Sequence, residues 1–271
     1  MVTRAAVFGL VLASSLFGGL ARADAPPNDE RARALAAEAA AKATGISKSE
    51  LNTRRLEGLE DDLFFSEIKI AGRIRKGAYF YEVENGGYLI TTDGVRYRPR
   101  SPQRWYVAVS TTDGETFGLF GFAKANEAFR RLVMKIPVEI KDAVEAKIFA
   151  KFYLEAVYQR RAGIVYDELR FKHKVEEHFL GYYDSQEPVA EKEQRFRRWW
   201  NGFKATRLAG PLEPTAKAEV SDGYVVSMRI LEMTVGRPPE LWEWSFGIQK
   251  DGVSQLLGKR PLFPASVEQA R

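Results

Sequence analysis

The spacing of hydrophobic residues changes three times along the chain. Helix-type spacing over residues 29–43 gives way to alternation of apolar and polar residues between about 64 and 122. Helical spacing returns over residues 124–205, and alternation resumes over residues 214–260. Because strands and helices come in separate runs, this order favours an α+β fold over an alternating α/β fold. The sequence predicts an antiparallel meander sheet, a central helical block and C-terminal antiparallel hairpins.

Capping residues bound the first predicted helix. Asn28 or Asp29 can accept a hydrogen bond at its N-terminus, and Gly45 can adopt the left-handed conformation that ends many helices. Residues 47–50 have the sequence Ser-Lys-Ser-Glu, a capping-box pattern. This pattern predicts a second short helix directly after the first.

Two hairpins are predicted in the first strand region, beside a strand at residues 64–70. Residues 79–84 alternate and lead through Asn-Gly-Gly into a second strand at residues 88–92. Residues 105–111 and 115–122 form the second hairpin, around Thr-Asp-Gly. Turn residues of this kind tolerate the positive φ angles that tight hairpins need.

The remaining elements follow from the same two periods. The helices are predicted at residues 124–135, 138–162, 165–180 and 189–205, and the C-terminal strands at residues 218–220, 224–234, 241–249 and 253–257. Turns containing Asp-Gly join the first pair and the last pair of these strands, which is typical of antiparallel hairpins, and a loop with Arg237-Pro238-Pro239 connects the two pairs.

A domain boundary is predicted near Ala123, where strands give way to helices. It separates an N-terminal helix and antiparallel sheet at residues 24–122 from the helical block and C-terminal hairpins at residues 123–271. In the alternative, the C-terminal strands join the N-terminal sheet within one large domain.

Residues 1–23 have the features of a signal peptide. Arg4 supplies the positive charge, an apolar stretch of about 16 residues follows, and Ala21-Arg22-Ala23 offers small residues at the cleavage positions. The apolar stretch is shorter than a typical membrane span of about 20 residues. The sequence therefore predicts cleavage near Ala23, a periplasmic or secreted protein, and no membrane span after signal removal.

Composition narrows the possible classes of function. The chain has 271 residues and no cysteine, which excludes disulfide frameworks and thiolate metal sites. Cleavage after Ala23 removes two arginines and no acidic residue, leaving 39 basic and 36 acidic side chains. A net charge of +3 is too small to indicate nucleic-acid binding. The chain also lacks a Walker loop and a Gly-x-Gly-x-x-Gly sequence, so no nucleotide cofactor is predicted.

The two histidines do not have the spacing of a zinc site. His173 and His178 are five residues apart, whereas a zinc-binding helix needs histidines four apart on one face. At about 100° per residue, five-residue spacing turns the two rings roughly 140° apart. We therefore predict a pair of surface histidines and no metal site.

No catalytic residues are predicted. Ser47 and Ser66 lie in partial matches to nucleophile motifs, and neither has the local structure that the motif requires. Glu82 and Glu84 share one face of a predicted strand, but a glycosidase needs two carboxylates that face each other across a cleft. The sequence alone identifies no such pair.

Aromatic residues form a stripe on one predicted strand. Trp242, Trp244 and Phe246 are two residues apart and therefore share a face. If the stripe is buried, it belongs to the core; if it is exposed, it can stack on sugar rings or bases. Polar residues on the opposite face favour the core interpretation.

Two arginine groups are the candidate binding residues. On the predicted helix at 189–205, Trp199 and Trp200 lie opposite a polar arc that holds arginines, and packing below a solvated face is the simpler interpretation. The second group lies in a loop with two prolines. The candidates are Arg195, Arg197 and Arg198 on the helix, and Arg96, Arg98 and Arg100 in the loop, which Arg104 extends.

These observations favour an exported binding or interaction module of the bacterial cell envelope without enzymatic activity. The expected partners are an anionic envelope glycan, a lipid headgroup or a protein, with no nucleic acid and no cofactor. The alternative is a hydrolase that acts on an envelope polymer through carboxylates. A third hypothesis is an assembly protein with an exposed sheet edge. A pocket with two facing carboxylates would favour the hydrolase, and a bare strand edge would favour assembly.

Overall fold

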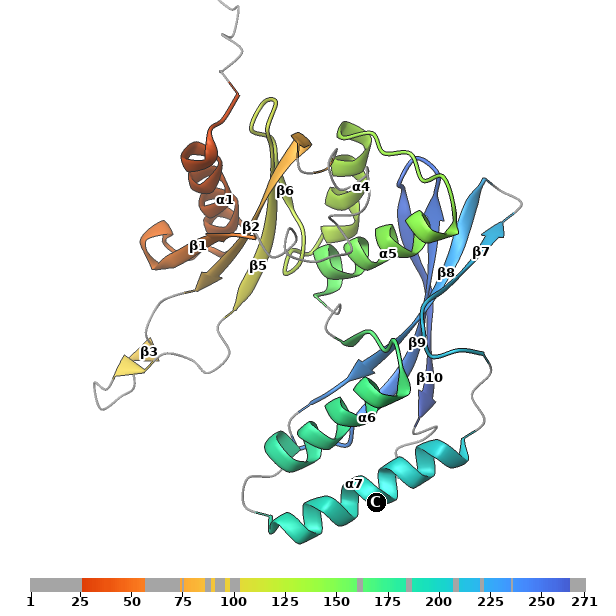
Figure 1. Ribbon diagram of the computed structural model, residues 1–271. Coiled ribbons are helices and arrows are strands. Elements are labelled where there is room, and N and C mark those ends of the chain that lie inside the picture. The colour runs from red at the N-terminus through yellow and green to blue at the C-terminus, as the bar shows by residue number, and fades with distance from the viewer. Residues whose placement is uncertain are drawn as a thin grey trace, which may run out of the picture.

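The computed structural model describes residues 26–56, 74, 76–85, 89–90, 96–97, 103–159, 163–183, 187–206, 210–219, 222–234 and 236–263. Within these ranges the chain has an α+β fold with two four-stranded antiparallel sheets. Helices α4 (Ala125–Lys135) and α5 (Ala143–Tyr158) lie between the two sheets (Figure 1). The predicted fold class is therefore confirmed.

The first sheet has the strand order β1-β2-β5-β6. Its strands are β1 (Leu51–Arg55), β2 (Ala78–Asn85), β5 (Arg104–Ser110) and β6 (Thr116–Gly118).

Helix α1 (Asp29–Thr44) covers one face of this sheet. Ala32, Ala36 and Ala40 are fully buried against it, because small side chains four residues apart form a flat stripe that allows close approach. The helix ends are as predicted. Asn28 accepts a hydrogen bond from the backbone N–H of Arg31, and Gly45 has a φ of 74°.

The predicted hairpin between residues 79–84 and 88–92 is wrong. Strand β2 pairs with β1 on one side and with β5 on the other. Strand β3 (Leu89–Ile90) pairs instead with β4 (Arg96–Tyr97). Because Phe80 to Val83 are all buried, β2 belongs in the interior of a sheet and takes partners from distant parts of the chain.

The predicted second helix is reduced to one turn. Residues Lys48–Glu50 form a short 3-10 helix (η1), and Leu51 already begins β1. The side chain of Ser47 makes no capping bond to the helix and contacts the hydroxyl of Ser49 instead. Pairing with β2 therefore outweighs the local helix signal. The strand expected at residues 64–70 lies outside the described ranges.

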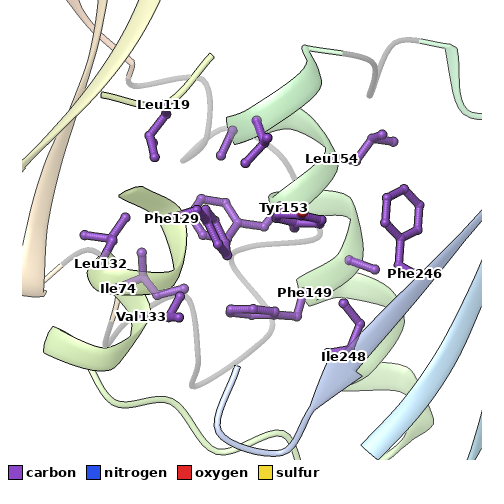
Figure 2. Close-up of a cluster of buried hydrophobic side chains, with 14 of the residues drawn as sticks. Ile74, Leu119, Phe129, Leu132, Val133, Phe149, Tyr153, Leu154, Phe246 and Ile248 are labelled. Carbon is purple, nitrogen blue, oxygen red and sulfur yellow. The ribbon is translucent and has the colours of Figure 1, made fainter. Parts of the chain in front are cut away.

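The helices between the sheets share one hydrophobic core with both. Phe129 from α4 contacts Phe149 and Tyr153 from α5, with ring centroids 5.0–6.1 Å apart. Phe246 of the second sheet lies on the far side of this cluster, 5.9 Å from Tyr153 (Figure 2). Helix α5 begins at Ala143 rather than near residue 138, because Asp142 caps it and accepts hydrogen bonds from two backbone N–H groups.

The second sheet follows chain order, β10-β9-β8-β7. Within the described residues it is separate from the first, so the C-terminal strands do not join the N-terminal sheet. The domain boundary near Ala123 stays a prediction. The last strand extends to Phe263, beyond the predicted end near residue 257, and Pro261 is tolerated there because β10 lies at the sheet edge. The strands are β7 (Thr215–Glu219), β8 (Gly223–Glu232), β9 (Glu240–Gln249) and β10 (Ser254–Phe263).

Helix α6 (Glu168–Glu177) and helix α7 (Val189–Ala205) pack on one end of the second sheet. A π-helical turn, η4 (His178–Tyr183), follows α6. Leu231 and Leu241 of the sheet face a cluster of aromatic side chains from α6, η4 and α7. The sheet therefore buries one face against α5 and part of the other face against α6 and α7. Helix α7 spans the predicted residues.

Candidate functional site

The arginines of α7 are exposed and most are paired with carboxylates. Arg195 binds Glu187 with a 2.6 Å contact between Nε and Oε1, and Arg197 contacts Glu193 at 3.2 Å. Arg198 is also exposed. We call Arg195, Arg197 and Arg198 the α7 arginine face.

The tryptophans of α7 point away from the arginine face. Trp199 and Trp200 are buried in the aromatic cluster of α6 and α7, with 8% and 6% of their surface exposed. The Trp199 indole N–H donates a hydrogen bond to the Pro239 carbonyl. The arginines and the tryptophans of this helix therefore lie on different faces, as the packing interpretation expects.

The second arginine group is described only in part. Arg96 lies in β4, whereas Arg98 and Arg100 lie outside the described ranges. Arg104 begins β5 and is well placed to contact a ligand, because it lines a hollow in the surface. The structure therefore does not bring the predicted loop and helix arginines into a common site.

The hollow has a volume of about 320 Å³ and lies where β5 begins and α5 ends. Its walls carry two aromatic rings, two carboxamides and one guanidinium group. The lining residues are Gln103, Arg104, Trp105, Phe120 and Gln159, and we call this site the β5–α5 hollow.

Backbone hydrogen bonds hold the aromatic wall in place. The Phe120 carbonyl accepts from the N–H of Tyr106 at 2.9 Å, and the Phe120 N–H donates to the carbonyl of Ala156 in α5. Gly121 has a φ of 85°, and a Cβ at this position would lie 2.6 Å from the Trp105 ring. Only glycine allows the chain to pass so close to Trp105, which fixes Phe120 beside it.

Gln159 has a conformation that is uncommon for a residue other than glycine. It ends α5 with a φ of 51°, in the left-handed region, and its backbone N–H donates to the Glu155 carbonyl. Its side-chain amide donates to the Tyr106 hydroxyl at 3.1 Å, and that hydroxyl donates to the Glu155 carboxylate at 3.3 Å. This chain of hydrogen bonds holds the Gln159 side chain in place where it lines the hollow.

Two carboxylates lie close to the arginine of the hollow and compensate its charge. The Arg104 guanidinium is 4.0 Å from Glu82 and 4.0 Å from Glu84. Glu82 is buried and also binds Arg54 at 3.1 Å. Burial and the nearby negative charge of Glu155 raise the pKa of the Tyr106 hydroxyl, so it stays protonated and remains a hydrogen-bond donor.

The histidines do not meet in the structure. His173 is exposed and contacts Glu177 at 3.4 Å. The prediction that His178 lies on the surface is wrong, because it is only 4% exposed and its Nε2 contacts the Arg237 carbonyl at 2.9 Å. The π-helical turn begins at His178 and carries its ring inward. Among the residues that the structure describes, no group of three or more metal-ligating side chains comes together.

The aromatic stripe on β9 belongs mainly to the core. Trp244 and Phe246 are 1% and 0% exposed and face α5, which confirms the core interpretation for both. Trp242 is partly buried beside them. The ammonium group of Lys259 lies 3.5 Å from the centre of the Trp244 ring and covers it from the edge strand.

Sequence reasoning missed most of the β5–α5 hollow. Arg104 was part of the predicted basic group, but Gln103, Phe120 and Gln159 carry no motif. Phe120 and Gln159 come from separate turns that meet only because the Phe120 N–H bonds to the end of α5. A glycine after Phe120 is the one local sign of a close approach at this position.

Comparisons with protein families, curated proteins and solved structures found no match for this chain. No helix within the described part of the chain is long and apolar enough to span a membrane.

Proposed function

We propose that this protein is an exported binding module of the bacterial cell envelope and that the β5–α5 hollow holds its ligand. The lining of the hollow supports the proposal. The partly exposed Phe120 ring, two carboxamides and a guanidinium group surround an open hollow of about 320 Å³, with the buried Trp105 beside them. Small-ligand sites combine apolar surface with a few convergent polar groups, and their volumes start at about 300 Å³.

The same lining disfavours the hydrolase alternative. A carboxylate-dependent glycosidase needs two carboxyl groups about 5–10 Å apart on either side of the bond that it cleaves. The five lining residues include no carboxylate, and the nearby Glu82 and Glu84 pair with Arg104. The hollow therefore favours binding over hydrolysis.

The assembly alternative receives less support from the edge strand. In the described sheet, β10 pairs with β9 on one side only, which leaves a long edge. Lys259, Arg260 and Pro261 lie on this strand, and charged residues and proline at an edge oppose pairing with another strand. We therefore propose a glycan segment, rather than a second sheet, as the ligand.

Export rests on residues 1–23 and has its own test. We expect protein recovered from the envelope fraction to begin at Asp24 because the cleavage site follows Ala23. Intact-mass measurement of that protein checks this. A mass that retains residues 1–23 would contradict processing.

The binding proposal is tested with fragments of bacterial envelope polysaccharide immobilised on a sensor surface. We expect the purified protein to bind them and the Phe120→Leu variant to bind about fivefold to tenfold more weakly, since the stacking ring is lost while apolar volume is kept. Arg130→Gln, on the exposed surface of α4, is the control and should bind like the parent. Equal binding by Phe120→Leu and the parent would contradict the proposal, as would binding only to phosphatidylglycerol vesicles.

A further inference from the structure

We infer that the β5–α5 hollow binds an uncharged sugar rather than an anionic one. The inference rests on the proposed function and specifies its ligand class. It departs from the sequence-based expectation of an anionic glycan, which depended on exposed arginines. Three features of the described residues carry it: the compensation of Arg104, the carboxylates near the wall, and the polar groups that line the hollow.

Arg104 does not offer an uncompensated positive charge. Two carboxylates, Glu82 and Glu84, lie 4.0 Å from its guanidinium group, and Glu82 is buried with a side-chain exposure of 6%. Arg54 also pairs with Glu82, so the two arginines and the two carboxylates balance, and a ligand carboxylate or phosphate would meet no net positive charge at Arg104. Arg104 can still donate hydrogen bonds to the hydroxyl oxygens of an uncharged ligand.

The inner wall adds further negative charge. Gln159 contacts the Tyr106 hydroxyl, which in turn donates to the Glu155 carboxylate. The charges of Glu155 and Glu82 both help to keep Tyr106 protonated, although burial has the larger effect. The potential at this wall therefore disfavours anions. An uncharged ligand does not experience this repulsion.

The carboxamide and aromatic groups of the hollow suit the hydroxyl groups and the C–H faces of a sugar ring, respectively. A carboxamide has two N–H donors and an acceptor oxygen, so Gln103 and Gln159 can bond to hydroxyls or to an acetamido group. One bond from Gln159 to Tyr106 leaves capacity for a ligand. The partly exposed Phe120 presents ring surface for a C–H face of the sugar, and the buried Trp105 supports the wall beside it.

The test uses three trimers of β-1,4-linked sugars that differ in charge. They are N-acetylglucosamine (neutral), glucosamine (cationic) and glucuronic acid (anionic), each titrated calorimetrically into the purified protein. We expect the neutral trimer to bind at least tenfold more tightly than either charged trimer, with an affinity that does not change between low and high salt. Phe120→Leu should weaken this binding about fivefold to tenfold.

A second variant changes the charge beside Arg104 and should strengthen the binding of one trimer rather than weaken it. Glu84→Gln removes one of the two carboxylates beside Arg104, so we expect it to tighten binding of the anionic trimer several-fold and to leave the neutral trimer within about twofold. An unchanged affinity of Glu84→Gln for the anionic trimer would overturn the inference.

The two proposals fail in different ways. Tightest binding of the anionic trimer by the parent protein overturns the inference, as does equal binding of all three, and both leave the proposed function standing if Phe120→Leu weakens the binding. If none of the three trimers binds but envelope polysaccharide binds at the hollow, the inference is likewise overturned and the proposed function stands. If neither the trimers nor the polysaccharide bind, both proposals are wrong.

Discussion

The α7 arginine face and the β5–α5 hollow contain the same kinds of residue in opposite arrangements. On α7, the tryptophans and arginines are neighbours in the sequence, but the helix turns the rings inward and the charges outward. At the hollow, Arg104 lies beside Phe120 and Gln159, which come from other parts of the chain, and all three line one surface. Proximity in the sequence therefore does not predict which aromatic and basic groups can act on one ligand.

The difference lies in how many segments build each surface. The α7 arginine face belongs to one helix, whose periodicity assigns every side chain to the core or to solvent. The hollow is formed by the start of β5, by Phe120 and by the end of α5. Segments that meet at their ends leave gaps that one regular element cannot leave. This is why the hollow, rather than the helix, combines rings with hydrogen-bonding groups.

The largest expected effect tests whether the α7 tryptophans are core residues. Trp200→Ala removes a side chain that is 6% exposed and contacts Phe171 and Phe203, so we expect a loss of about 3–5 kcal/mol in the free energy of unfolding. Thermal melts measure this. Arg198→Ala, on the opposite arc, should melt within about 0.5 kcal/mol of the parent. A stable Trp200→Ala variant that loses glycan binding would make α7 a binding surface after all.

The next effect concerns α5, the helix that forms one wall of the hollow. Burial lowers the pKa of Lys151 to about 8, so its ammonium form opposes folding below that pH. Because the unfolded chain holds this proton up to about pH 10.5, stability should rise with pH between about 8 and 10.5. Lys151→Met should raise stability at neutral pH by about 1–3 kcal/mol and flatten that rise. Denaturant unfolding across this pH range checks both, and an unchanged pH profile would contradict the assignment.

A smaller effect is expected for Tyr106→Phe, which tests whether the Tyr106 hydroxyl positions Gln159 or only stabilises the fold. Tyr106→Phe removes the hydroxyl that joins Gln159 to Glu155, which should cost about 1 kcal/mol of stability. Ligand affinity should fall as well, because the Gln159 side chain is no longer held in place at the hollow. Calorimetric titration beside a melt measures both quantities. A variant with lowered stability and full affinity would show that the hydroxyl does not position Gln159.

The smallest expected change in stability comes from Gln159 itself. Gln159→Gly relieves the left-handed backbone at a φ of 51° but loses the bond to Tyr106, so the two terms nearly cancel, to within about 1 kcal/mol. Affinity should fall because the amide is gone. Gln159→Asn retains an amide and tolerates this backbone, so it should recover part of the affinity. Full affinity in Gln159→Gly would remove Gln159 from the site.

The elements that the sequence predicts well are those fixed by local pattern. Helix α7 and the second sheet follow their periods, because each strand of that sheet pairs with its neighbour along the chain. The first sheet was mispredicted because β2 pairs with β1 and β5, whose positions depend on distant contacts. The hollow was not predicted for the same reason, since a long-range backbone hydrogen bond from Phe120 to Ala156 brings Phe120 close to Gln159.

Hydrogen–deuterium exchange of the protein with and without bound N-acetylglucosamine trimer tests the central claim most directly. It reports where the ligand lies without any substitution. We expect the ligand to slow exchange in residues 103–106, 119–121 and 156–159, and to leave residues 189–205 unchanged. Slower exchange confined to α7, with none at the start of β5 or the end of α5, would contradict the account.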